Sequence, residues 1–279
     1  EKAIKRYFPI FVLPTMIAFT LGFIIPFVEG VYLSFCKFTT VNDAKFVGFA
    51  NYAKVFTDET FVHAFWYTAA FTVVSVILIN VLAFAVALLL TKGFKGTNIF
   101  RTVFFMPNLI GGIVLGYIWQ LLLNGILMKF SRTLTYSSTY GFWGLIILMC
   151  WQQIGYMMII YIAGIQNIPG ELIEAAEIDG ATKWQILKKV TIPMVMPSIT
   201  VCTFLTLTNS FKLFDQNLAL TNGEPSKMSE MLALNIFNTF YGRTGYEGVG
   251  QAKAVIFFIL VTVIALTQNY LTRRKEVQQ

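Results

Sequence analysis

Long apolar stretches separated by short polar ones dominate the chain. Six of these stretches carry few charges and lie near residues 8–34, 61–90, 102–123, 142–166, 194–213 and 251–271. Each is long enough, as a helix, to cross a hydrocarbon layer about 30 Å thick. Because backbone polar groups need partners inside lipid, spans of this length and pattern are helical. The pattern predicts an all-α integral membrane protein with six transmembrane helices, forming a single domain over residues 1–279.

The composition supports this class. Hydrophobic residues make up 56% of the chain and charged residues only 13%, whereas an ordinary soluble domain is about 25% charged. A net charge of +7 would suggest a nucleic-acid partner in a soluble protein, but here the basic residues cluster beside apolar stretches, where they set topology. We therefore expect a lipid bilayer and no nucleic acid as partner. The first apolar stretch is long and lacks a small-x-small cleavage site, so we expect a retained span.

The distribution of basic residues predicts the orientation. Six spans place both termini on one side, and the segments on that side carry twelve basic residues: Lys2, Lys5, Arg6, Lys92, Lys95, Arg101, Lys183, Lys188, Lys189, Arg273, Arg274 and Lys275. The opposite loops carry seven: Lys37, Lys45, Lys54, Lys129, Arg132, Lys227 and Arg243. This excess favours cytoplasmic termini. Residues 169–193 then form the one sizeable cytoplasmic loop, where a cytosolic partner would dock.

Local signals predict a helix, a glycine elbow and a second helix in this loop. Pro169 and Gly170 open the first helix, and Gly180 interrupts it. Thr182 and Gln185 have the spacing of a capping box, so a second helix begins there. That helix is expected to run until Pro193 starts the fifth span.

The same loop shows an apolar ridge flanked by charge. Its members recur at intervals of three and four: Ile173, Ala176, Gly180, Trp184 and Leu187. Two interpretations stay open on physical grounds alone. The ridge either docks against a protein partner or floats the loop on lipid headgroups as an interfacial amphipathic helix.

Residues 174–193, "EAAEIDGATKWQILKKVTIP", resemble the cytoplasmic EAA loop of the membrane subunits of binding-protein-dependent ABC importers. Further stretches resemble the maltose-transporter-like carbohydrate branch of this family: "FVGFANYAKVF" at 46–56, "FRTVFFMPNLIGGIVLGYIWQ" at 100–120 and "LTNGEP" at 220–225. The resemblance covers about residues 5–275. It implies that the ATPase-coupling residues are Glu174, Ala175, Ala176, Asp179, Gly180, Ala181 and Pro193.

The resemblance also implies the assembly. A second homologous six-span permease subunit would complete the path, two ATPase subunits would bind ATP and Mg, and an extracytoplasmic sugar-binding protein would deliver the cargo. The location implied is the plasma (inner) membrane of a bacterium or archaeon, with a multi-pass chain that binds no cofactor itself. The sequence agrees, because it contains no Gly-Lys pair and so no phosphate-binding loop of the G-x-x-x-x-G-K-[ST] type. The outer loops are also too short for a separate ligand-binding domain.

Polar residues deep in the fourth and fifth spans are the candidate substrate site. Such residues usually face a cavity or a partner helix, and amides beside aromatic rings suit sugars. The resemblance implies that the sugar lies about midway across, between these two spans. The polar candidates are Gln152, Gln153, Tyr156, Asn209, Ser210 and Lys212, and the resemblance adds Leu213 as a pocket position. Lys212 and Asp215, three residues apart, either pair with each other or contact cargo.

Catalysis or metal binding by the chain is not expected. His63 is the single histidine and lies at a predicted span boundary, and the three cysteines Cys36, Cys150 and Cys202 are far apart. The leading hypothesis is an ATP-driven sugar importer subunit working by alternating access. An importer of another solute such as glycerol phosphate, an ion-coupled secondary transporter and, last, an intramembrane enzyme are the alternatives.

Helix packing and helix breaks can also be predicted. Gly112 and Gly116, and likewise Ala83 and Ala87, are spaced four apart and would let helices approach closely. The prolines at positions 14, 26 and 107 fall inside predicted spans and are expected to kink or interrupt them.

Overall fold

The computed structural model describes residues 2–93 and 95–274. The one β ladder in these ranges joins β1 (Cys36–Lys37) to β2 (Lys45–Phe46) in antiparallel register. The helices are α1 (Lys2–Phe19), η1 (Thr20–Ile24), α2 (Ile25–Leu33), η2 (Val41–Asp43), α3 (Ala50–Phe56), α4 (Glu59–Leu90), α5 (Thr97–Phe105), η3 (Met106–Leu109), α6 (Gly112–Leu127), η4 (Met128–Phe130), η5 (Leu134–Tyr136), α7 (Ser138–Gln166), α8 (Gly170–Ile178), α9 (Lys183–Ile186), η6 (Leu187–Thr191), α10 (Ile192–Met194), α11 (Met196–Phe211), α12 (Asp215–Leu220), α13 (Leu232–Gly242) and α14 (Glu247–Arg273). The predicted helical membrane fold is confirmed. Lys275, one of the twelve basic residues used to predict the orientation, lies outside the described residues.

Within the described residues, five helical segments are long and apolar enough to cross a membrane. They are Tyr7–Leu33, Glu59–Leu90, Gly112–Phe130, Ser138–Gln166 and Glu247–Arg273. A sixth is present if the bent pair Lys183–Met194 and Met196–Phe211, which turns by 69°, is counted as one span. The count of six and the cytoplasmic position of both termini therefore stay predictions.

The third predicted span, 102–123, is not one continuous helix, and the interruption predicted at Pro107 is confirmed. The chain ends α5 at Phe105, passes through the 3₁₀ turn η3 and becomes extended at Ile110 and Gly111 before α6 begins at Gly112. Pro107 has no N–H to continue the hydrogen-bond ladder, and its ring disfavours the preceding turn. The apolar pattern continues across this break because both flanking helices are apolar, which hides the break from a hydropathy argument.

The first predicted span is broken less than expected. α1 continues through Pro14, and a single π-helical turn, η1, precedes α2, in which Pro26 is the second residue. A wider turn of this kind accommodates a residue that cannot donate a backbone hydrogen bond.

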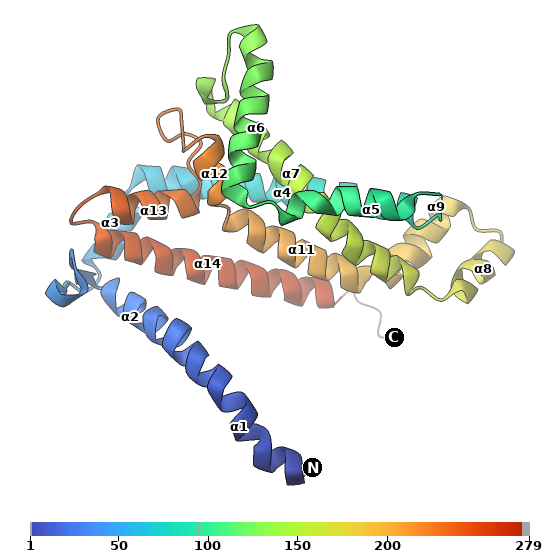
Figure 1. Cartoon of the computed structure of the whole chain (residues 1–279), viewed down its shortest axis with the longest axis horizontal. Helices are drawn as coiled ribbons and strands as arrows, with labels where there is room; N and C mark the ends of the chain where they lie inside the picture. Colours follow the sequence, from blue (N-terminus) through green and yellow to red (C-terminus); the bar gives the residue numbers. More distant parts are fainter. Residues whose placement is uncertain (1, 94, 275–279) are drawn as a thin grey trace. The chain divides into compact units, whose positions relative to one another are not determined.

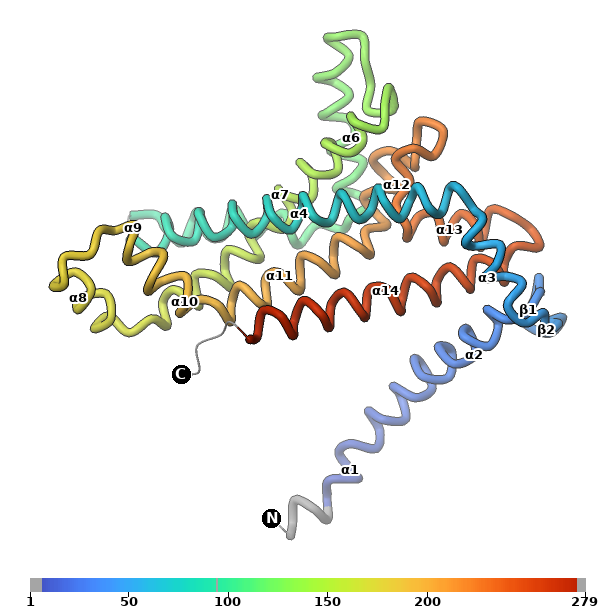
Figure 2. Tube along the Cα trace, turned by 180° about the vertical axis from the view of Figure 1, so that it is seen from behind, coloured from blue at the N-terminus to red at the C-terminus, as the bar shows by residue number. Residues whose placement is uncertain are grey.

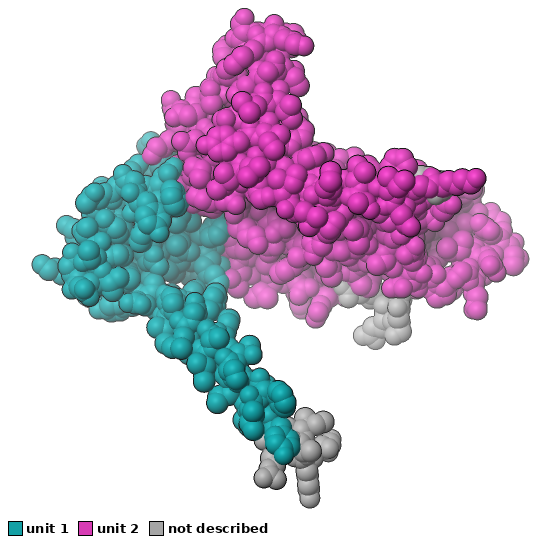
Figure 3. All heavy atoms as spheres, viewed as in Figure 1, with its two compact units in different colours: residues 1–61, 236–259 teal, residues 62–235, 260–279 magenta. Residues whose placement is uncertain are grey.

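The described chain packs as two compact units, coloured separately in Figure 3. Unit 1 comprises residues 1–61 and 236–259, and unit 2 comprises residues 62–235 and 260–279. The interpretation of the chain as a single domain stays a prediction.

Unit 1 is held by buried polar side chains. Asn51 is 5% exposed, and its Nδ2 donates to the carbonyl oxygens of Ser34 at 2.9 Å and Cys36 at 2.8 Å. Lys253 of α14 is fully buried and forms an ion pair of 2.7 Å with Asp58. Its ammonium group also donates to the Thr239 hydroxyl at 2.8 Å. These contacts fix the chain before α4 against α13 and α14.

Unit 2 is built around α7, which contacts α5 and α11. α7 and α11 lie side by side in both views (Figures 1 and 2). A series of side-chain hydrogen bonds connects three of its helices. The Tyr161 hydroxyl donates to Asn80 Oδ1 at 2.7 Å, and Asn80 Nδ2 donates to the Thr206 hydroxyl at 2.9 Å. Such interhelical hydrogen bonds are a main source of association between membrane helices. They tie α4, α7 and α11 together.

The predicted close approach at the small residues is confirmed for α6. A Cβ atom on Gly112 would lie 2.7 Å from Asp215 Cβ, and one on Gly116 would lie 2.5 Å from Ala219 Cβ. α6 therefore packs directly against α12. Ala83 and Ala87 of α4 are fully buried, which agrees with their predicted packing role.

Candidate functional site

A cavity of about 270 Å³ opens where α11 ends and α12 begins. It is lined by Met149, Gln153, Asn209, Lys212, Leu213, Phe214, Asp215 and Gln216. Four of the seven predicted substrate residues therefore line one cavity: Gln153, Asn209, Lys212 and Leu213. Their role stays a prediction. Gln153 lies near the middle of α7, so the cavity sits about halfway along that helix.

Two amides from neighbouring helices meet on the cavity wall. Asn209 Nδ2 lies 3.4 Å from Gln153 Oε1, a long hydrogen bond. Gln153 is 8% exposed and Leu213 is 4% exposed, whereas Lys212 and Asp215 are exposed. The wall thus combines amide donors and acceptors with an aromatic ring from Phe214 and two opposite charges.

Gln152 is not among the residues that line this cavity, but it is hydrogen-bonded to Gln216, which is. Its Oε1 accepts a hydrogen bond of 2.8 Å from Gln216 Nε2, and its own Nε2 lies 3.4 Å from the Ile110 carbonyl oxygen. Gln152 therefore connects α7 to α12 and to the break after η3. Adjacent residues on a helix point about 100° apart, and here Gln152 and Gln153 have different partners, Gln216 and Asn209.

Two further candidates lie outside the cavity lining. Ser210 is fully buried, and its Oγ has no hydrogen-bond partner among the described residues. Tyr156 is half-buried beside Phe105, with 6.4 Å between ring centroids. The structure places both on the helices that form the cavity but not on its surface.

Of the two alternatives left open for Lys212 and Asp215, pairing with each other is not observed. Lys212 ends α11 and Asp215 begins α12, so the break between the helices separates residues that a continuous helix would place on one face. No ion pair joins these two side chains within the described part of the chain. Both instead line the cavity.

The loop at 169–193 contains the predicted glycine elbow. Gly180 has a φ of +77°. Its N–H donates to the Glu177 carbonyl, and the Ala181 N–H donates to the Ala176 carbonyl, each at 3.0 Å. This is the Schellman pattern, in which glycine supplies the left-handed residue after a helix. The predicted capping box is also present, because Thr182 and Gln185 exchange side-chain and backbone hydrogen bonds.

The continuous apolar ridge predicted along this loop is wrong. Ile173 packs against the core, whereas Trp184 is 70% exposed. The left-handed turn at Gly180 changes the chain direction, so the spacing of three and four no longer describes one face. The loop exposes Ile178 and Trp184 together with the carboxylates of Glu174, Glu177 and Asp179. The remaining predicted coupling residues are exposed at Ala175 and partly buried at Ala176, Ala181 and Pro193.

The second helix of the loop does not end at Pro193, where the sequence analysis expected its end. It continues past Pro193 through η6 and α10, and the chain bends at Val195 before α11 starts at Met196. Proline in the first turn of a helix loses no hydrogen bond that the helix needs. Pro193 therefore lies inside the short helix α10 rather than at the start of the fifth span.

Sequence reasoning missed Met149 and Gln216 as cavity residues. Met149 lies one turn before Gln153 on α7, a periodic signal that was present. Gln216 lies beyond the break after α11, so no helical spacing from Asn209 leads to it. His63, by contrast, has its Nε2 2.9 Å from the Met228 carbonyl oxygen, a structural contact.

The chain matches the family model "Binding-protein-dependent transport system inner membrane component" over residues 79–277. It is 42% identical over 278 residues to the "Probable starch degradation products transport system permease protein AmyD" of Thermoanaerobacterium thermosulfurigenes, covering 96% of this chain and 94% of that protein. It is 32% identical to the "Alpha-glucoside transport system permease protein AglF" of Rhizobium meliloti, covering 92% and 80%.

The fold agrees with a solved structure. A bacterial ABC transporter involved in the import of the acidic polysaccharide alginate superimposes with a TM-score of 0.83 and 22% identity, over 98% of both chains. At this identity the likeness concerns the fold. Together with the family match over most of the chain, it leads to one conclusion. The chain belongs to the family of binding-protein-dependent transport system inner membrane components.

Proposed function

We propose that the chain is the membrane-spanning permease subunit of an ATP-driven, binding-protein-dependent sugar importer whose cargo is an oligosaccharide. In this proposal it forms the translocation path with a second homologous six-span subunit, and two separate ATPase subunits bind ATP and Mg. An extracytoplasmic binding protein delivers the sugar. The chain is a transport subunit, not an enzyme, as its family and the permease names of its relatives indicate.

The cavity halfway along α7 is the observation that carries the proposal. Its amides, Gln153 and Asn209, can donate and accept hydrogen bonds as sugar hydroxyls require, and Phe214 offers a ring for the C–H face. The volume of about 270 Å³ lies below the ~300–1,000 Å³ typical of small-molecule sites. A cavity of this size, open on one side, fits a path that a second subunit completes.

The names of relatives point to the same cargo class. Starch degradation products and alpha-glucosides are named for two of them, and both are sugars. The charges in the cavity fit a neutral solute better than glycerol phosphate, because Lys212 is accompanied by Asp215. A phosphate would need an excess of positive charge.

Hydrogen bonding to the cargo is tested by Asn209→Leu. The transporter, reconstituted in vesicles with its partner subunit, ATPase and binding protein, is expected to need about three to ten times more sugar-loaded binding protein for half-maximal ATP hydrolysis, or to lose stimulation, since one hydrogen bond contributes about 0.5–1.5 kcal/mol. Thr208→Val on the neighbouring position, outside the cavity lining, is the matched control. If Asn209→Leu, Thr208→Val and wild type show the same stimulation of ATP hydrolysis, the cavity does not lie on the translocation path.

The coupling role of the loop is tested by Gly180→Ala. Alanine adopts a φ of +77° at a cost of about 1 kcal/mol or more, so the turn between α8 and α9 is expected to reorganise and stimulated ATP hydrolysis to fall severalfold. Gly170→Ala is the control: neither glycine has an atom within 4 Å of an added Cβ, and only Gly180 has a positive φ. Unchanged stimulation in Gly180→Ala would favour the alternative of an interfacial helix.

The same assay separates the proposal from an ion-coupled transporter. Uptake that follows ATP and the loaded binding protein, and survives collapse of the ion gradients by ionophores, supports the importer. Uptake that stops on adding ionophores and ignores ATP contradicts it.

A further inference from the structure

A second cavity, of about 440 Å³, lies at the ends of two candidate spans. Its lining comes from the end of α4, the following turn, the start of α5 and the end of α7: Leu90, Thr91, Gly93, Gly96, Thr97, Asn98, Ile99, Arg101 and Gln166. Leu90 is the last residue of the span Glu59–Leu90, and Gln166 is the last residue of Ser138–Gln166. In a membrane this cavity therefore lies at the level of the lipid headgroups.

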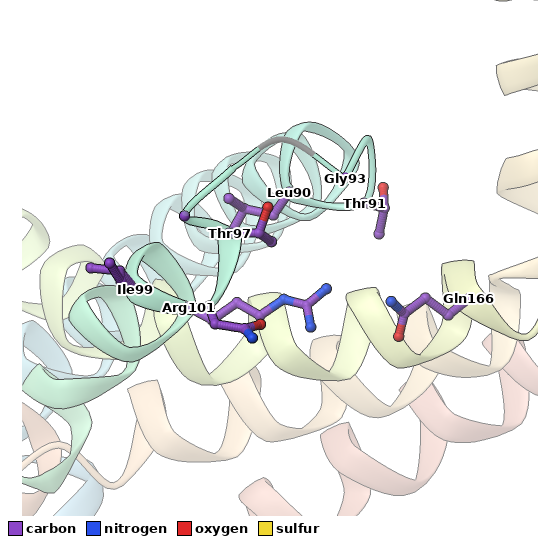
Figure 4. A pocket seen from close by; sticks show the side chains of 9 residues that line it. Leu90, Thr91, Gly93, Thr97, Ile99, Arg101 and Gln166 are labelled. Carbon is purple, nitrogen blue, oxygen red and sulfur yellow. The ribbon is translucent and has the colours of Figure 1, made fainter.

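Arg101 is the cation of this cavity. Figure 4 shows its guanidinium group pointing across the cavity toward the Gln166 amide. Its Nε is buried and has no hydrogen-bond partner, and Arg101 forms no ion pair with any residue that the structure describes. A buried donor without a partner is unfavourable, and a planar guanidinium binds phosphate through two parallel hydrogen bonds. The cavity thus has the donor set for an anionic oxygen ligand.

An apolar cavity adjoins the polar one. It measures about 360 Å³ and is lined by Arg101, Thr102, Phe105, Ile159, Ile162, Ala163 and Gln166. The two cavities share Arg101 and Gln166. Ile162 and Ile159 lie about one and two turns before Gln166 on α7, so the apolar cavity extends from the span end toward its middle.

We propose that these two adjoining cavities bind one anionic phospholipid. The phosphate lies against the Arg101 guanidinium and the Gln166 amide, and an acyl chain lies along Phe105, Ile159 and Ile162. A free anion would leave the apolar cavity without a ligand, and an uncharged apolar ligand would leave Arg101 unpaired. Exposed Lys92 and Lys95, in the turn before α5, add positive charge that favours an anionic over a zwitterionic headgroup.

The site is tested on the full chain, purified in a neutral detergent, by counting retained lipids with native mass spectrometry. Phosphatidylglycerol is titrated against phosphatidylcholine, and inorganic phosphate at millimolar concentration is added as competitor. Both lipids offer a phosphate to Arg101, but only phosphatidylglycerol has a net negative charge, and each basic residue near the headgroup contributes about 1 kcal/mol. With Lys92 and Lys95 beside the site, wild type is expected to retain one phosphatidylglycerol at least roughly tenfold more tightly than phosphatidylcholine. Phosphate alone is expected not to displace it.

Variants separate the two halves of the site. Arg101→Gln is expected to weaken phosphatidylglycerol retention roughly tenfold, and Arg101→Lys, which keeps the charge but not the fork, is expected to be intermediate. Ala163→Phe fills the apolar cavity and is expected to weaken retention of both lipids, whereas Ala85→Phe, at an exposed alanine of α4 that lines neither cavity, is expected to leave retention unchanged. Arg243→Gln, at an exposed arginine in a loop, is the charge control; far-UV circular dichroism checks that each variant is folded.

Three results would overturn the proposal. Arg101→Gln retaining phosphatidylglycerol as wild type does would remove the arginine from the site. Displacement of the lipid by inorganic phosphate would mean that the two cavities bind a free anion rather than a phospholipid. Ala163→Phe retaining both lipids as Ala85→Phe does would place the acyl chain elsewhere.

Discussion

Replacing Gly155 by alanine is expected to prevent α7 from packing against α5 and to destabilise the protein by about 3 kcal/mol or more, at or beyond the upper end of ordinary overpacking. An added Cβ would lie 1.8 Å from the Phe104 carbonyl oxygen and 2.7 Å from the Phe105 nitrogen. Both neighbours are backbone atoms, which cannot rotate away as a side chain can. The helices must therefore separate or α5 must shorten.

The measurement is the thermal unfolding midpoint in detergent, expected to fall by roughly 5 °C or more, together with the monodisperse fraction after gel filtration. Gly125→Ala is the matched control, since Gly125 lies inside α6 with no atom within 4 Å of an added Cβ. Alanine there is expected to leave the midpoint unchanged or raise it slightly, because it is the better helix former by up to about 1 kcal/mol. Equal midpoints for the two variants would contradict the observed contact of α5 with α7.

Asp58→Asn is expected to lower the free energy of unfolding by on the order of 3 kcal/mol, the loss typical when one partner of a buried ion pair is removed. The Lys253 ammonium group is fully buried and lies 2.7 Å from the Asp58 carboxylate. Removing the carboxylate leaves that buried charge less compensated. Glu59→Gln, at the exposed neighbouring carboxylate, is expected to change stability far less. Adding Lys253→Met to Asp58→Asn is expected to restore part of the loss.

The same pair predicts a pH dependence. Partial burial raises the pKa of Asp58, but hydrogen bonds from Lys253 and Thr60 and the charge of Lys253 outweigh this and hold the pKa at about 2, below the ordinary 3.8. A carboxyl with a lowered pKa in the folded state contributes stability above its unfolded pKa and loses it as the pH falls. The unfolding midpoint of wild type is thus expected to fall between about pH 4 and pH 2 more steeply than that of Asp58→Asn. Parallel curves would contradict the contribution of this ion pair.

Structural features that depend on interactions within a few residues could be predicted from the sequence. Four predicted spans agree with the structure to within about four residues at each end, because a long apolar stretch determines its own helix: 8–34, 61–90, 142–166 and 251–271. The capping box at Thr182 and the left-handed turn at Gly180 were also predictable. Both depend on hydrogen bonds that close between residues three to five apart.

What only the tertiary structure decided involves residues that come together from separate helices. The cavity joins Gln153 on α7 to Asn209 on α11 and Gln216 on α12. No local spacing relates these residues, so their meeting depends on how the helices pack.

Gln152 and Gln153 illustrate most clearly the difference between what the sequence determined and what the tertiary structure decided. The sequence by itself determined that two amides lie in the middle of an apolar span and need polar surroundings. It could not determine that Gln153 would line the cavity while Gln152 would bond to Gln216. Burial in lipid demands partners for both side chains, but the identity of each partner depends on which neighbouring helix packs against each face of α7.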